Sequence, residues 1–257
     1  MPLTQPCQFF NRVANHPFRQ WLWYQIQCNS GIRTYFHRLF RRYQIGRDSQ
    51  FAIGQWVQVL DRESILRTLD ANSKRHGLYF LPQQWDYCGG VYRVGKVVRS
   101  IMDDDGVFRP VSGTIMLDGM DCGGEPGTHG CGRSCPIFFR DEWVKPAQTP
   151  TFKPIDFDNG ARHMRVRSAH DIRSTLDWHG RRGGLMFMPE MYQWAGMRFR
   201  VTRRIQSVFE CGQYVVPRNP IFILEGLRCS GAVLGRRGPC DRACAILWHP
   251  DWLSPDD

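Results

Sequence analysis

The feature that most constrains this chain is an internal repeat. Residues 65–70 (ILRTLD) return 107 positions later as residues 172–177 (IRSTLD), and residues 117–122 (LDGMDC) return at the same offset as residues 224–229 (LEGLRC). After that cysteine the offset becomes 109, because the loop of the second copy is two residues longer. A constant offset over such a span indicates a duplicated domain.

The repeat divides the 257-residue chain into two units of ordinary domain length and an extension. Repeat 1 spans residues 51–147 and repeat 2 spans residues 162–257, and the stretch between them is a linker rich in proline and polar residues. Residues 1–50 match neither copy. They mix arginine with aromatic residues, and we expect a basic, aromatic helical extension packed on repeat 1. Contact with a membrane surface or nucleic acid is an alternative role for it, and so is a transit peptide.

Residue patterns within one copy favour strands. Residues 55–59 alternate between apolar and polar side chains, as a half-buried strand does. Residues 62–69 place Ile65, Leu66 and Leu69 on one face of a short helix that Asp61 can cap. Further strands are predicted at 78–80, 91–97, 114–117 and 136–139. We therefore expect a mainly β fold with short helices: two tandem homologous small barrel- or sandwich-like domains, for which an SH3-like barrel is one candidate topology, preceded by a helical N-terminal segment.

Charge is distributed unevenly along the chain, whose net charge is +10. Residues 1–50 carry seven arginines and one aspartate, residues 51–147 carry eleven basic and twelve acidic side chains, and residues 148–257 carry sixteen basic and eleven acidic. A nucleic-acid-binding chain usually spreads its basic side chains over a continuous surface. Nucleic acid therefore stays a possible partner but is not favoured.

Targeting signals are not evident in the sequence. The first apolar run, residues 21–24, is far shorter than a secretory core or a membrane span. We expect a cytoplasmic protein with no transmembrane segment. In a reducing compartment its ten cysteines would be thiols or metal ligands rather than disulfides.

Eight of the ten cysteines are distributed equally between the repeats, and three in each copy occupy matching positions next to glycine-rich turns. Cysteine thiolates are preferred ligands of structural zinc, which takes four of them or of histidine nitrogens in a tetrahedron. A C-x3-C pair on a turn can direct two thiolates at one ion. We therefore expect a Zn2+ ion in each repeat, with these candidate ligands: Cys88, Cys122, Cys131 and Cys135 in repeat 1, and Cys211, Cys229, Cys240 and Cys244 in repeat 2.

The fourth ligand differs between the copies, since Cys88 aligns with Ala195 and Cys211 aligns with Asp104. Other candidates for it are His129 and the matching carboxylates Asp118 and Glu225. Disulfides, an iron–sulfur cluster and thiols without a metal, including a reactive one, are the less favoured uses of the cysteines. Cys7 and Cys28 lie outside both copies and are expected to be plain buried thiols.

Sequence signatures of common enzymes do not occur: there is no nucleophile elbow, P-loop, dinucleotide fingerprint or H-E-x-x-H. The acidic run at residues 103–105 is typical of a solvated hairpin turn. Catalysis would require a metal held by three cysteines, with an open position for water or substrate. Asp118 or Glu225 could then act as general base.

Motifs shared by the two copies carry a resemblance to a family. The second copy has Gly-Leu-x-Phe-x-Pro-Glu-Met at 184–191, Phe-Arg-Val at 199–201, and Leu-Glu-Gly-Leu-Arg-Cys from 224 with C-x3-C and Trp-x3-Trp after it. It resembles an uncharacterised bacterial family of small cysteine-containing domains of about 100 residues, here in tandem duplicate. The copy departs from that pattern at Ala195, where a cysteine is expected. The resemblance covers both repeats but not residues 1–50, and it implies no activity.

Two functions are compatible with a duplicated domain of this kind. The first is a tandem zinc-stabilised binding or assembly module whose partner is a protein or an anionic ligand. Its candidate binding residues form a basic strand and turn: Arg198, Arg200, Arg203 and Arg204. The second is a small metal-dependent tailoring enzyme that uses a cysteine-ligated metal with an open coordination position.

Overall fold

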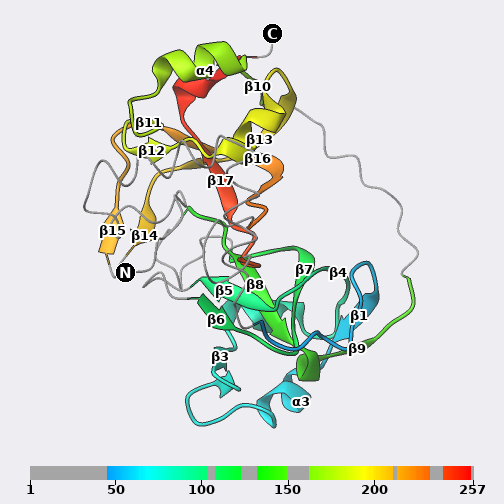
Figure 1. Ribbon diagram of the computed structural model, residues 1–257. Helices are drawn as coiled ribbons and strands as arrows, with labels where there is room; N and C mark the ends of the chain where they lie inside the picture. Colours follow the sequence, from blue (N-terminus) through cyan, green and yellow to red (C-terminus); the bar gives the residue numbers. More distant parts are fainter. Residues whose placement is uncertain are drawn as a thin grey trace.

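The computed structural model describes residues 45–102, 108–122, 132–149, 162–210, 213–231 and 240–255. Over these ranges the protein is mainly β with few helices, and each repeat forms one curled half-barrel sheet. Figure 1 shows the repeats as two lobes, repeat 1 in blue to green and repeat 2 in yellow-green to red. The predicted mainly β class is thus confirmed, whereas the predicted N-terminal helices lie outside the described residues.

The two sheets have the same strand order. In repeat 1 it is β8-β7-β4-β1-β9 and in repeat 2 it is β17-β16-β13-β10-β18, all antiparallel. The strands of repeat 1 are β1 (Trp56–Val59), β4 (Val91–Val97), β7 (Thr114–Asp121), β8 (Pro136–Arg140) and β9 (Val144–Pro146). Those of repeat 2 are β10 (His163–Val166), β13 (Arg198–Ile205), β16 (Ile221–Arg228), β17 (Ala245–Trp248) and β18 (Leu253–Pro255).

Irregularities in the two sheets match as well. The register between β4 and β7 shifts between Val94 and Lys96, and the register between β13 and β16 shifts between Val201 and Arg203. These positions are 107 residues apart, so the bulge has been duplicated with the domain. A bulge bends its strand and increases the local twist, which contributes to the curl of each sheet.

Short elements connect the strands. Repeat 1 contains α3 (Arg62–Leu66), β2 (Lys74–Arg75), β3 (Leu78–Tyr79), η1 (Pro82–Tyr87), β5 (Ser100–Met102), β6 (Phe108–Pro110) and η3 (Asp141–Trp143). Repeat 2 contains α4 (Ala169–Thr175), β11 (Arg181–Arg182), β12 (Leu185–Met186), η4 (Pro189–Trp194), β14 (Val208–Glu210), β15 (Gln213–Val215) and η5 (Pro250–Trp252).

Helix α3 begins where the sequence predicts and ends earlier. The Asp61 carboxylate accepts the backbone N–H of Ser64 at 2.8 Å, as an N-cap does. The helix was expected to reach Leu69, but the N–H groups of Thr68 and Leu69 bond to carbonyls three residues back, which tightens the last turn. The Thr68 hydroxyl donates to the Ile65 carbonyl at 2.7 Å and accepts the indole N–H of Trp143 at 2.9 Å.

Each repeat buries its own apolar core, and the central contacts are duplicated. Phe80 packs edge-on against Trp143 with ring centres 5.0 Å apart, and Phe187 packs against Trp252 in the same way at the same distance. All four side chains are at most 2% exposed. Aromatic pairs of this geometry contribute about 0.5–1.5 kcal/mol beyond their area burial.

The helices in the described ranges are all short. None of them has the length and apolar character needed to cross a membrane.

Candidate functional site

Two cysteines of repeat 1 are held together at one end of the sheet. Cys122 follows β7 and Cys135 precedes β8, and the Cys122 N–H donates to the Cys135 carbonyl at 2.8 Å. The Cys135 N–H in turn donates to the Cys122 sulfur at 3.3 Å. Cys122 is buried, with 8% of its surface exposed. The pairing of β7 with β8 therefore brings two thiols that are 13 positions apart into one place.

Repeat 2 reproduces this arrangement. The Cys229 N–H donates to the Cys244 carbonyl at 2.8 Å, the same bond at the equivalent positions. Gly231 connects the third cysteine to the pair, since its N–H donates to the Cys229 sulfur at 3.4 Å and its carbonyl accepts the N–H of Cys240 at 3.0 Å.

The remaining candidate ligands are placed less closely. Cys131, Cys211 and His129 lie outside the described residues. Cys88 follows η1, where its sulfur lies 3.9 Å from the Gln84 carbonyl. Within the described ranges no three Cys, His, Asp or Glu side chains are grouped closely enough to hold one ion, and none of the six described cysteines forms a disulfide.

Three of the described thiols have a raised pKa. A hydrogen bond with Cys122 raises the pKa of Cys135 far above its ordinary value; burial and the nearby Cys244 of the other repeat raise it further. Burial also raises the pKa of Cys244 and of Cys88. A nucleophilic cysteine needs the opposite shift. These thiols suit a buried structural role or a metal that displaces their protons, and do not suit nucleophilic catalysis.

The matching carboxylates face away from the thiols. Asp118 and Glu225 are exposed on β7 and β16. Glu225 Oε2 lies 3.6 Å from Arg200 Nε, so this carboxylate is engaged by the outer face of the sheet.

That outer face in repeat 2 is basic. Arg165 on β10 lies directly opposite Arg198 on β13, and His163 lies directly opposite Arg200. Arg165 and Arg198 are exposed, and Arg165 also donates to the Gly196 carbonyl at 2.9 Å. Like charges at directly opposite positions of an antiparallel pair lower the stability of the sheet.

The four predicted arginines are only partly on this face. Arg198 and Arg200 belong to it, whereas Arg203 and Arg204 follow the bulge of β13. Arg204 is exposed beside residues 216–220. Sequence reasoning missed His163 and Arg165 because the pairing of β10 with β13 cannot be read from either strand alone.

Repeat 1 has no such charge pair at the same place. Gln58 lies opposite Val91, and Trp56 lies opposite Arg93. Gln58 and Val91 are equivalent to Arg165 and Arg198. Trp56 and Arg93 are equivalent to His163 and Arg200. The fold therefore accepts neutral side chains here, and the basic face is a property of repeat 2 alone.

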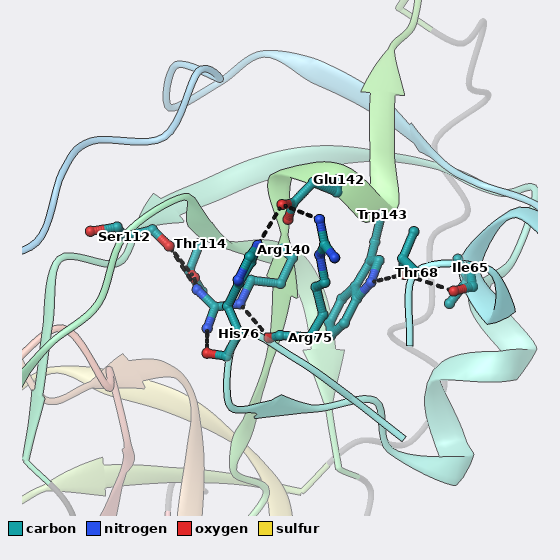
Figure 2. A network of polar contacts seen from close by, with 9 residues as sticks. All are labelled: Ile65, Thr68, Arg75, His76, Ser112, Thr114, Arg140, Glu142 and Trp143. Carbon is teal, nitrogen blue, oxygen red and sulfur yellow. Dashed lines mark hydrogen bonds and ion pairs between the residues drawn. The ribbon is translucent and has the colours of Figure 1, made fainter. Parts of the chain in front are cut away.

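A second polar arrangement in repeat 1 centres on Arg140 (Figure 2), which sequence reasoning also missed. This side chain, 8% exposed, donates to the carbonyls of Arg75, His76 and Ser112 at 3.1, 2.6 and 2.7 Å, and to the Thr114 hydroxyl at 2.8 Å. Burial lowers the pKa of Arg140. With its donors directed at the backbone, Arg140 connects the β2–β3 hairpin to the start of β7 and has a structural role.

Repeat 2 places His249 at the position of Arg140. His249 is 4% exposed, and its Nδ1 accepts the N–H of Asp251 at 3.1 Å. The neighbouring ion pair is common to both copies: Arg75 lies 3.4 Å from Glu142, and Arg182 lies 2.6 Å from Asp251. The only sequence signal for this arrangement is the recurrence of the two ion-pair positions at offsets of 107 and 109.

A hollow of about 900 Å³ lies beside Arg140. Cations and anions both line it, among them Arg47, Arg109, Asp48 and Glu142. Its mixed charges select no single class of ligand, so the basic face of repeat 2 is the stronger candidate for a binding site.

Comparison of the chain with protein-family models, with curated proteins and with solved structures finds no significant match.

Proposed function

We propose that this protein is a tandem binding module that holds an acidic segment of a partner protein on the outer face of repeat 2. The observation that carries the proposal is the cross-strand pair Arg165–Arg198, flanked by His163 and Arg200. Exposed arginines from two paired strands share this face, and a guanidinium group binds a carboxylate through charge-assisted hydrogen bonds.

Comparison of the two copies supports a binding role. Since Gln58 and Val91 occupy the same positions in repeat 1, the arginines are not a requirement of the sheet. A surface charge that the fold does not need is more readily explained by recognition than by stability. None of its four basic positions, all among the described residues, carries an aromatic side chain other than His163 for stacking bases, so an acidic protein segment suits it better than nucleic acid.

We further propose that zinc bound by thiolates stabilises each repeat. The duplicated Cys122–Cys135 and Cys229–Cys244 arrangements support this part, because each brings together two candidate ligands that are far apart in the sequence. A closed structural site would leave the ion without an open position, as expected of a module rather than an enzyme.

Binding of a fluorescein-labelled peptide of ten glutamates, measured by anisotropy, tests the proposal. The variant Arg165→Gln/Arg198→Val installs the residues of repeat 1, which already face each other in that sheet. A control variant, Arg67→Gln/Lys145→Gln, removes two exposed positive charges from repeat 1. We expect about a tenfold or greater loss of affinity in the first variant and less than about a twofold change in the control, with binding weakened by salt.

Equal affinities in the wild type and the first variant would overturn the proposal. Tighter binding of a labelled single-stranded oligonucleotide, lost in the same variant, would instead assign the face to nucleic acid.

A further inference from the structure

The two repeats contact each other through reciprocal hydrogen bonds. The Gly132 N–H of repeat 1 donates to the Ser207 carbonyl of repeat 2 at 2.8 Å, and the Asp241 N–H of repeat 2 donates to the Ser100 carbonyl of repeat 1 at 2.7 Å. Gly132 is equivalent to Asp241, and Ser100 is equivalent to Ser207. The two bonds therefore join equivalent residues, one donated from repeat 1 to repeat 2 and the other from repeat 2 to repeat 1. Such reciprocal bonds are expected where a two-fold axis relates two equivalent surfaces.

One residue position meets its own counterpart, as happens only on such an axis. Asp121 and Arg228 are equivalent, and Arg228 Nη2 lies 2.5 Å from Asp121 Oδ2. Arg228 Nη1 also donates to the Ser134 carbonyl of repeat 1 at 3.2 Å. The Arg228 side chain is 36% exposed and the Asp121 side chain 27%, so the pair is partly withdrawn from water.

Departures from symmetry at the interface are complementary. The Asp241 carboxylate of repeat 2 accepts the N–H groups of Arg99 and Ser100 at 2.9 and 3.1 Å, and lies 3.6 Å from Lys96 Nζ. In repeat 1 the position equivalent to Asp241 is occupied by Gly132. A Cβ there would lie 3.2 Å from the Ile205 side chain, which replaces the smaller Val98 of repeat 1.

We propose that the repeats are matched halves of a self-complementary dimer interface that have diverged, so that repeat 1 selects repeat 2 over a second copy of itself. Two copies of repeat 1 would place Asp121 against Asp121 and leave the Arg99 and Ser100 N–H groups without their carboxylate. Two copies of repeat 2 would place Arg228 against Arg228 and force Asp241 towards Ile205. Each wrong pairing is opposed by like charge and by a second defect.

The test uses the full chain with residues 151–158 replaced by a protease recognition sequence. After cleavage, size-exclusion chromatography with light scattering measures whether the two fragments stay together. We expect the cut wild type to remain one particle of the original mass at micromolar concentration. Asp121→Arg or Arg228→Asp alone should raise the dissociation constant of the fragments about tenfold or more, and the double exchange should restore it to within about threefold.

Controls keep the result interpretable. The exchange Glu63→Arg/Arg67→Glu reverses an exposed ion pair between α3 and its C-cap residue and should leave the association unchanged. Thermal unfolding of the uncut variants detects misfolding. If a charge reversal does not fold, Asp241→Gly replaces it, since that variant installs the residue of repeat 1 and should weaken the association about tenfold. The proposal fails if the cut wild-type fragments separate, or if the double exchange is no better than the single reversals.

Discussion

Asp121 and Arg228 occupy the same position in two copies of one domain, and their side chains form an ion pair 2.5 Å long. The two repeats therefore share a fold and also contact each other through equivalent surfaces. The reciprocal bonds of Gly132 and Asp241 lie around this pair. The basic face of repeat 2 lies on other strands, β10 and β13.

Removal of Arg140 is expected to destabilise repeat 1. Its guanidinium donates to three backbone carbonyls and the Thr114 hydroxyl, and Arg140→Met would remove all four of these bonds, leaving the Ser112 carbonyl only its bond from Thr114. The predicted loss is about 2–4 kcal/mol of unfolding free energy, measured by urea denaturation. Arg67→Met, at the exposed C-cap position after α3, should change it by less than about 0.5 kcal/mol. Equal effects would contradict the structural role of Arg140.

Acid is expected to destabilise repeat 2 through His249. Burial lowers the pKa of this imidazole below its ordinary 6.5, although Asp251 opposes the shift. Below about pH 6.5 the unfolded chain therefore binds a proton at His249 that the folded repeat does not, and stability falls as the pH falls. Above that pH both states are neutral and the group contributes no pH dependence.

Urea midpoints at pH 7.5 and pH 5.5 check this prediction. His249→Asn retains an acceptor for the Asp251 N–H, and should lose less stability between the two pH values than the wild type. The difference should be below about 1.4 kcal/mol per pH unit. If the wild type and His249→Asn lost the same stability between the two pH values, protonation of His249 on unfolding would be contradicted.

The duplicated Trp–Thr contacts predict equal costs in the two repeats. The Trp143 and Trp252 indoles donate to the hydroxyls of Thr68 and Thr175 at 2.9 and 3.2 Å. Trp143→Phe and Trp252→Phe should each lower the unfolding free energy by about 2–3 kcal/mol, since each leaves a cavity and removes a hydrogen bond to a threonine hydroxyl, which keeps only its own bond to the carbonyl of Ile65 or Ile172. Differential scanning calorimetry would detect the losses. A large cost in one repeat alone would show that the cores are not equivalent.

Zinc content should depend on each thiol pair separately. We expect two zinc ions per purified chain by elemental analysis, and one after either Cys122→Ser/Cys135→Ser or Cys229→Ser/Cys244→Ser. Because zinc binds the thiolate and the pKa of Cys135 and of Cys244 is raised, lowering the pH by one unit should weaken zinc binding by up to about tenfold for each thiol that loses a proton. Competition with a coloured chelator measures the affinity. A chain that is free of metal and indifferent to added zinc would contradict the zinc proposal.

The repeat made much of the fold predictable. Strands expected at 91–97 and 136–139 are seen as β4 (Val91–Val97) and β8 (Pro136–Arg140), and the Asp61 cap begins α3 as expected. These features follow from local patterns of apolar side chains and from capping chemistry, which act over a few residues. The 107-residue offset then assigns the same elements to repeat 2.

The contacts that define the candidate surfaces could not be predicted in this way. The pairing of β10 with β13 brings Arg165 to Arg198, and the interface brings Asp121 to Arg228 from 107 positions away. Neither strand pairing nor domain docking leaves a periodic signal in one sequence. Arg140 likewise reads as an ordinary charged residue, and only its burial beside backbone carbonyls reveals its role.

Amide hydrogen exchange at Gly132 and Asp241, followed by NMR on the uncut protein, tests the two-fold relationship most directly. Each N–H is donated across the interface, so both should exchange far more slowly than unprotected amides. Both should lose their protection together in Asp121→Arg and regain it when Arg228→Asp is added. Unprotected exchange at either amide in the wild type, or loss of protection at one and not the other, would contradict a reciprocal interface.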